Sequence, residues 1–169
     1  EALGMLTSLD SLELNDTWMD DETAEAFPTL PHLKHLSLPL TRLTNPTFLS
    51  NYYGLASVHI QASPVTDEVI TYLKPSKQTL KILRLDDTKV SNRGMEVLKE
   101  FPSLEALFLS RTSVTGEGLR AVLTLPSLQH LFLHRGELPA EVEAEFRKSH
   151  PHLKLNVDEF REVKRSGDP

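Results

Sequence analysis

The histidines are the residues of this sequence whose type and spacing first suggest chemistry. His130 and His134 lie four residues apart, and on a helix this spacing places two imidazoles on one face, where they can share a metal ion. On a strand the same residues share a face but lie roughly 13 Å apart, which is too far for one ion. The role of these histidines therefore depends on the element that carries them.

Acidic residues are the second chemical candidates. Carboxylates at 20–22 and 86–87 could act as general acids or bases. The first run suits the start of a helix, where carboxylates meet the positive end of the dipole, and the second falls at a strand end, where it could pair with Arg84 or Arg111. The glycines at 116–118 lack the spacing and the following lysine of a phosphate loop. We therefore predict no catalytic, metal-binding or cofactor-binding site, and a protein that is not an enzyme.

The composition argues against further classes of protein. A chain of 169 residues with 39% hydrophobic and 25% charged residues is typical of a globular domain. The net charge of -6 argues against a general nucleic-acid binder, and no apolar run approaches the roughly 20 residues that span a bilayer. The absence of cysteine excludes disulfides and thiol chemistry and favours an intracellular compartment, cytoplasmic or nuclear.

Leucines repeat along the chain with the spacing L-x-x-L-x-L, and the six copies start 24, 22, 25, 24 and 24 residues apart. A hydroxyl residue follows each of the first five strands, and an apolar helical stripe comes next. Units this small cannot bury their own apolar strip, so they must stack. We predict an α/β fold, a right-handed solenoid with a parallel sheet on its concave side and helices on its convex side. The expected helix N-caps are Asp20, Thr44, Thr66, Ser91 and Thr115.

The segments LKILRLDDTKVSNRGMEVLKEFPSL (80–104) and LEALFLSRTSVTGEGLRAVLTLPSL (104–128) carry the pattern most clearly. They resemble the leucine-rich repeat superfamily, in particular its helical-convex subtype of ribonuclease-inhibitor-like and F-box-associated, cysteine-containing-like repeats. The resemblance implies a non-enzymatic protein-interaction module, with substrate recognition for a ubiquitin ligase as its leading specific version. A structural spacer and an enzyme-inhibitor-like regulator are the alternatives. Thr or Ser replaces the Asn or Cys that the family often uses after the strand, and a hydroxyl there can still bond to the backbone.

The resemblance covers nearly the whole chain, so we expect one domain over 1–169 with about six repeats. Residues 1–8 resemble the end of a preceding repeat. Residues 139–163 contain an unusually charged helical segment and are expected to form a C-terminal cap, followed by a tail at 164–169. We infer from these ends that the chain is part of a longer protein.

The side chains between the leucines are expected on the concave face and are not required by the repeat. Phe108 and Phe132 should lie side by side on adjacent strands. Exposed aromatics among arginines have the composition of an interaction hot spot, so we predict that a protein partner binds here. The other residues of the predicted site are Ile82, Arg84, Arg111, His130, His134 and Arg135.

Two other interpretations of the aromatic pair stay open. The rings could stack only on each other, as cross-strand aromatics do, or the C-terminal tail could cover them with Phe160 or Val163. The charge of this face also changes along the solenoid. Glu13 and Asp16 make its N-terminal end acidic, while arginines lie near its C-terminal end. A partner with an acidic or phosphorylated segment beside an apolar anchor would fit the basic end.

Overall fold

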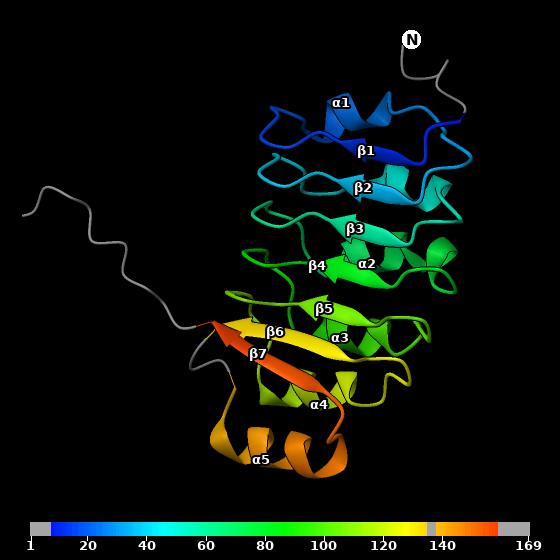
Figure 1. Cartoon of the computed structure of the whole chain (residues 1–169). Helices are drawn as coiled ribbons and strands as arrows, with labels where there is room; N and C mark the ends of the chain where they lie inside the picture. Colours follow the sequence, from blue (N-terminus) through cyan, green and yellow to red (C-terminus); the bar gives the residue numbers. More distant parts are fainter. Residues whose placement is uncertain (1–7, 135–137, 159–169) are drawn as a thin grey trace, which may run out of the picture.

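The strands form a single parallel sheet in the computed structural model, which describes residues 8–134 and 138–158. Within this part the sheet has seven strands in the order of the chain, so each strand pairs with the next one (Figure 1). His130 and His134 lie on one strand, as the leucine spacing predicted. The strands are β1 (Ser11–Glu13), β2 (His35–Ser37), β3 (Ser57–His59), β4 (Ile82–Arg84), β5 (Ala106–Phe108), β6 (His130–His134) and β7 (Lys154–Asp158).

The helices all cover one face of the sheet and leave the other face, which we call the open face, free of helices (Figure 1). This is the alternating solenoid that the repeat predicted, with the open face as its expected concave side. No helix in the described ranges has the length and apolar character needed to cross a membrane. The helical segments are α1 (Asp21–Glu25), η2 (Thr47–Asn51), α2 (Glu68–Tyr72), η3 (Lys74–Ser76), α3 (Asn92–Leu98), α4 (Gly116–Val122) and α5 (Ala140–Ser149).

The repeated leucines form the core between the sheet and the helices. Leu36, Leu83 and Leu107, which occupy equivalent places on β2, β4 and β5, are at most 1% exposed. Phe101 lies among them and is fully buried. Burial of such side chains contributes about 1.5–3 kcal/mol each, which explains why L-x-x-L-x-L is the most regular part of the sequence. At β1 the equivalent Leu12 is only partly buried.

The helix starts follow the predicted caps in part. Thr44 and Thr66 were predicted as N-caps, but they do not cap a helix, because their hydroxyls donate instead to the carboxylates of Asp21 and Glu68. The N-caps that the structure confirms are Asp20, Ser91 and Thr115.

Several sequence predictions fall on residues outside the described ranges. They concern the preceding repeat at 1–8, except for Ser8, the end of the expected cap beyond residue 158, and the tail at 164–169. Inside the expected cap, α5 and β7 are formed, and β7 pairs with β6 in parallel. The division into about six repeats with a separate cap therefore stays a prediction.

The hydroxyl residues after the strands act as the sequence predicted. Thr88 donates from its Oγ1 to the carbonyl of Leu85 at 2.7 Å, and Thr112 donates in the same way to Leu109 at 2.8 Å. Thr17 and Thr41 repeat this contact in the first two units. The hydroxyl thus satisfies a backbone carbonyl that the end of the strand leaves without a ladder partner.

The turn after each strand contains a non-glycine residue in the left-handed region, one in each of five successive repeats. In the first four of these repeats its N–H donates to a carbonyl of the next repeat, as Asp87 does to Ser110 at 2.9 Å. The turn therefore joins neighbouring repeats but holds an L-residue in a conformation that costs roughly 1–2 kcal/mol. The residues and their φ values are Asp16 (52°), Leu40 (58°), Ala62 (56°), Asp87 (55°) and Arg111 (57°).

We expect Ala62→Gly to raise the free energy of unfolding by about 0.5–1 kcal/mol, since the relief of strain exceeds the entropy that glycine adds to the unfolded chain. Ala144→Gly, at an exposed position inside α5, is the matched control and should lower the free energy of unfolding by about 0.5–1 kcal/mol. Urea denaturation of the two variants measures both changes. A lower free energy of unfolding in Ala62→Gly would contradict the claim that the backbone at position 62 is strained.

Candidate functional site

Two phenylalanines stack on the open face of the sheet. Phe108 on β5 and Phe132 on β6 are register partners, their ring centroids are 3.9 Å apart, and their planes differ by 4°. Both rings lie on the open face because the leucines on either side of each point into the core. Together with Ile82 on β4 and its register partner Ala106 on β5, they form the group that we call the aromatic patch.

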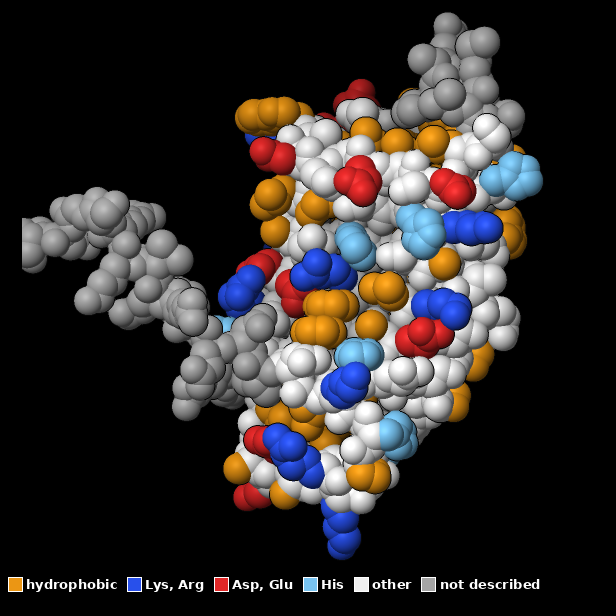
Figure 2. Space-filling view, in the orientation of Figure 1, with side chains coloured by type: hydrophobic (Ala, Val, Ile, Leu, Met, Phe, Trp, Pro, Cys, Tyr) orange, Lys and Arg blue, Asp and Glu red, His pale blue; other side chains and the backbone are white. Residues whose placement is uncertain are grey.

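The aromatic patch is accessible to a partner. Ile82 is 37% exposed, and the other three members are partly exposed. Figure 2 shows a small group of hydrophobic side chains near the middle of this face, with basic and histidine side chains around it. The structure thus brings together Ile82, Phe108 and Phe132, as the sequence predicted.

Arg84 closes one end of the stack. Its guanidinium carbon lies 4.4 Å from the centre of the Phe108 ring, and its Nε lies 3.6 Å from Oδ2 of Asp86. Burial raises the pKa of Asp86, although the backbone N–H of Ser110 and the charge of Arg84 act in the opposite direction. Arg84 is therefore held by an aromatic ring on one side and a carboxylate on the other.

Arg111 lies at the rim of the open face and forms a bidentate ion pair with Asp87. A shallow hollow of about 360 Å³ lies between this pair, the Arg84–Asp86 pair and the two phenylalanine rings. Its lining thus combines two arginines with two aspartates. This balance does not favour the acidic or phosphorylated partner that the arginines alone suggested.

Two further predicted site residues lie on β6. His130 lies beside Phe132, with ring centroids 6.2 Å apart and planes within 13°, and His134 ends the strand. Arg135 lies outside the described residues. Within the described ranges no group of three His, Cys, Asp or Glu residues is arranged to hold a metal ion.

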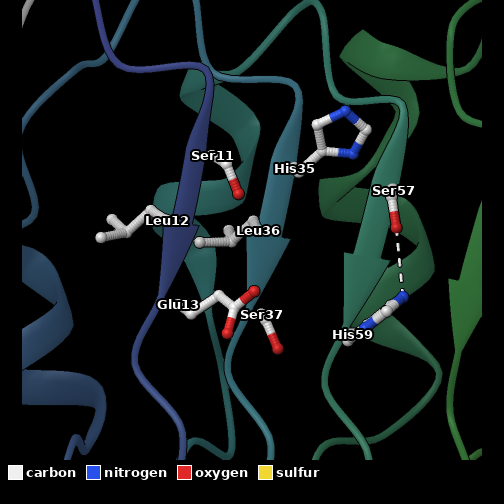
Figure 3. A pocket seen from close by; sticks show the side chains of 8 residues that line it. All are labelled: Ser11, Leu12, Glu13, His35, Leu36, Ser37, Ser57 and His59. Atoms are coloured by element: carbon white, nitrogen blue, oxygen red, sulfur yellow. Dashed lines mark hydrogen bonds between the residues drawn. The ribbon is translucent and has the colours of Figure 1, made fainter.

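A second hollow lies over β1–β3, with a volume of about 230 Å³ (Figure 3). Here Oγ of Ser57 lies 3.1 Å from Nε2 of His59, which is the contact between a nucleophile and its base in hydrolases. Such a base also needs a group that orients it, and Glu13 lies two strands from His59, roughly 10 Å away. We therefore interpret Ser57 and His59 as a polar surface pair.

His59 gives the protein a specific pH dependence. Burial lowers the pKa of His59 below its ordinary value of 6.5, the charge of Arg84 lowers it further, and Glu13 opposes the shift. As the pH falls from 6.5 towards the lower folded-state pKa, the unfolded chain binds more protons than the folded one, so stability is lost. His59→Gln should flatten the fall in unfolding free energy over this window, as measured by urea denaturation between pH 7.5 and 5. The exposed His32→Gln is the control, and an unchanged slope in His59→Gln would contradict the prediction.

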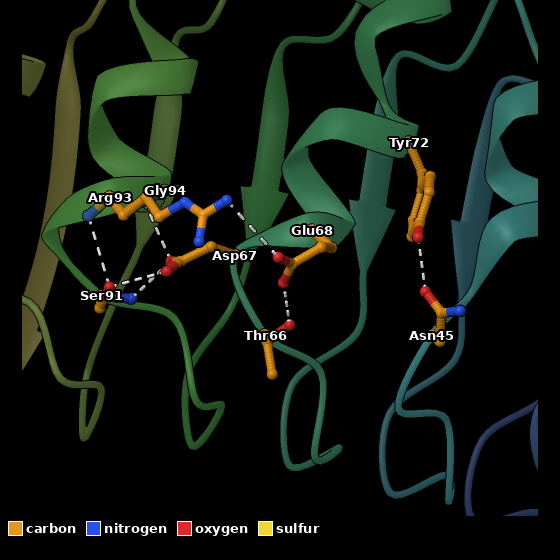
Figure 4. A network of polar contacts seen from close by, with 8 residues as sticks. All are labelled: Asn45, Thr66, Asp67, Glu68, Tyr72, Ser91, Arg93 and Gly94. Atoms are coloured by element: carbon orange, nitrogen blue, oxygen red, sulfur yellow. Dashed lines mark hydrogen bonds and ion pairs between the residues drawn. The ribbon is translucent and has the colours of Figure 1, made fainter.

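A polar network between repeats on the helical side was missed by the sequence prediction (Figure 4). The carboxylate of Asp67 accepts from the N–H of Ser91 at 2.8 Å, from its hydroxyl at 2.7 Å, and from the N–H of Gly94 at 3.0 Å. Asn92 bonds Thr115 of the next repeat in a similar way. A Cβ on Gly94 would come within 2.6 Å of Asp67 Oδ1, so glycine leaves the space for this carboxylate. The available signal was the Asp or Asn that directly follows four of the five predicted caps.

Trp18 is a second feature that the sequence prediction missed. This tryptophan, the single one in the chain, lies in the loop after β1 and is 77% exposed. The guanidinium carbon of Arg42 lies 3.9 Å from the centre of its ring. The residue type itself was the available signal in the sequence, because the equivalent turn positions of other repeats carry Pro64, Lys89 and Ser113 and not a large aromatic residue.

The sheet, the repeat and the exposed face define a leucine-rich-repeat solenoid. The structure is similar to an internalin (inlF) from Listeria monocytogenes, with 20% sequence identity and a TM-score of 0.54. The match covers 94% of this chain and 46% of the internalin chain, so this chain spans about half of that protein's length.

This likeness shows the fold alone, and the helical-convex subtype stays a prediction. No family model matches the chain, and a search of curated proteins found no match.

Proposed function

We propose that this protein is a non-enzymatic recognition module that binds a protein partner at the aromatic patch on its open, concave face. The observation that carries this proposal is the partly exposed stack of Phe108 and Phe132. The repeat needs leucines at the flanking positions, but it does not need aromatic rings between them. Aromatic residues that stay accessible beside an arginine are the usual anchors of protein interfaces.

The chemistry of the patch favours an apolar anchor on the partner. Asp86 and Asp87 match the charges of Arg84 and Arg111, so these arginines add orientation and hydrogen-bond donors more than net charge. An aliphatic or aromatic side chain of the partner would pack against Ile82 and Phe132, while polar groups around the hollow fix its position. His130, His134 and Arg135 complete the proposed site.

We further propose an intracellular setting, cytoplasmic or nuclear, and substrate recognition for a ubiquitin ligase as the leading specific role. Support for the setting is the absence of cysteine, and support for the role is the resemblance of 80–104 and 104–128 to the helical-convex repeats. A structural spacer and an enzyme-inhibitor-like regulator are the alternatives.

Affinity capture from cells, followed by quantitative mass spectrometry, tests the proposal. The wild-type protein is compared with Phe132→Ala and with Tyr53→Ala, which removes an aromatic ring that is 74% exposed in the loop before β3. A recognition module should retain its partner with Tyr53→Ala and lose it with Phe132→Ala. A spacer would capture the same proteins with all three.

A further inference from the structure

An exposed tryptophan, a stacked arginine and an exposed leucine lie together at the loop edge of the first two repeats. Trp18 follows β1, and Leu40 and Arg42 follow β2. The two loops are joined by backbone hydrogen bonds from Asp16 to the carbonyl of Pro39 at 3.0 Å and from Arg42 to that of Met19 at 2.8 Å. We call Trp18, Leu40 and Arg42 the loop-edge patch.

The fold does not require any member of the loop-edge patch. Leu40 is 56% exposed, and its φ of 58° also places it in the left-handed region, where leucine is strained. The same left-handed turn position in other repeats carries Asp16, Ala62 and Asp87, so the turn does not need a leucine. A leucine that is more than half exposed and also strained contributes little to stability, and the exposed part of its apolar side chain is open to contact with another molecule.

Arg42 stacks on Trp18. Its guanidinium covers one face of the indole and restrains the ring, while the high exposure of Trp18 leaves the rest of the ring to solvent. Tryptophan and arginine are the residue types that most often dominate binding energy at protein interfaces. A restrained ring also loses less conformational entropy when a partner covers it.

The charges around the loop-edge patch indicate the kind of partner. Residues 8–33 contain seven acidic residues and no lysine or arginine. Glu13, at the end of β1, and Asp16, two residues before Trp18, form no ion pair with any residue of the described ranges. Figure 2 shows acidic side chains beside the hydrophobic ones at this end of the molecule.

We propose that the loop-edge patch binds a protein segment in which an apolar side chain is flanked by lysine or arginine. The apolar side chain packs on Trp18 and Leu40, and the flanking cations lie against the acidic residues around them. A second copy of this chain does not fit, because contact between two identical loop-edge patches would bring the two acidic ends together. The surface is separate from the aromatic patch, since the nearest strands of the two patches, β2 and β4, are two strands, or about 10 Å, apart.

Selection from a displayed library of random 12-residue peptides that lack tryptophan tests this proposal. Peptides are selected on the wild-type protein and counter-selected on Trp18→Ala. Binding of a selected synthetic peptide is then titrated by the fluorescence of Trp18, which is the sole tryptophan of the chain. We expect enriched peptides to contain an apolar residue flanked by Lys or Arg, to shift the emission to shorter wavelength, and to bind more weakly at high salt.

Leu40→Gly separates binding from folding. It removes the exposed side chain and relieves the strained turn, so the variant should remain folded while its affinity for a selected peptide falls at least tenfold. Phe132→Ala should leave this affinity unchanged, which distinguishes the loop-edge patch from the proposed function of the aromatic patch. The proposal is overturned if enriched peptides lack basic residues, if Leu40→Gly binds them like the wild type, or if sedimentation shows a dimer that Trp18→Ala abolishes.

Discussion

Simultaneous replacement of Phe108 and Phe132 by alanine should weaken binding of the captured partner about thirty-fold or more. Truncation of one anchor at the centre of an interface typically costs about 2 kcal/mol or more, and a tenfold change corresponds to about 1.4 kcal/mol. Because the two rings stack on each other, each also holds the other in place. The effects of the single variants should therefore not be additive.

The same double substitution should change the stability of the protein much less than its affinity. An aromatic pair contributes about 0.5–1.5 kcal/mol beyond the area that it buries. The two rings stay partly exposed, whereas the core residue Leu107, on the opposite face of β5, is fully buried. Isothermal titration calorimetry measures the affinity, and urea denaturation measures the free energy of unfolding.

Tyr53→Ala serves as the matched control for the double variant, since it also removes an exposed ring. Its affinity for the partner should equal that of the wild type. If the double variant binds the partner as tightly as the wild type does, the stacked rings are only a cross-strand pair and the partner binds elsewhere.

Asp67→Ala should lower the free energy of unfolding by about 2–3 kcal/mol. The carboxylate joins α2 to the start of α3 through three hydrogen bonds with Ser91 and Gly94. Each hydrogen bond contributes about 0.5–1.5 kcal/mol, and hydrogen bonds to charged groups contribute more. Its loss leaves the N–H of Ser91 without its acceptor at a partly buried site. Urea denaturation measures the change.

Two variants test the cause of this loss. Asp67→Asn keeps Oδ1 as the acceptor for both N–H groups and should lose only about 1 kcal/mol. Glu68→Ala, at the next position but exposed, should change the free energy of unfolding by less than about 0.5 kcal/mol. Equal losses in Asp67→Ala and Glu68→Ala would contradict the role of the carboxylate between repeats.

The regular part of the fold could be predicted because it depends on one physical requirement. Leu83, Leu107 and Leu131 must face the same core, so their spacing appears directly in the sequence. The same alternation predicted that Phe108 and Phe132 lie side by side on the other face. Their mutual stacking follows from the strand spacing, which any parallel sheet imposes.

Contacts between side chains of different repeats could not be predicted in this way. Asp67 reaches Ser91 across 24 residues of chain. The sequence offered Arg111 only as one of two possible partners for the carboxylates at 86–87, and the structure pairs it with Asp87. Whether an arginine is paired or available to an acidic partner depends on side-chain geometry that periodicity does not encode. Trp18 was missed for another reason: it lies in a turn, where the repeat pattern demands nothing apolar.

A photo-crosslinking amino acid in place of Phe132 tests the central claim most directly. We expect ultraviolet irradiation to attach the captured partner to position 132, on the open face of β6. The same crosslinker in place of Tyr53, which is in the loop before β3 and similarly accessible, should attach little or none of it. Crosslinking of the partner through position 53 but not through position 132 would contradict recognition at the aromatic patch.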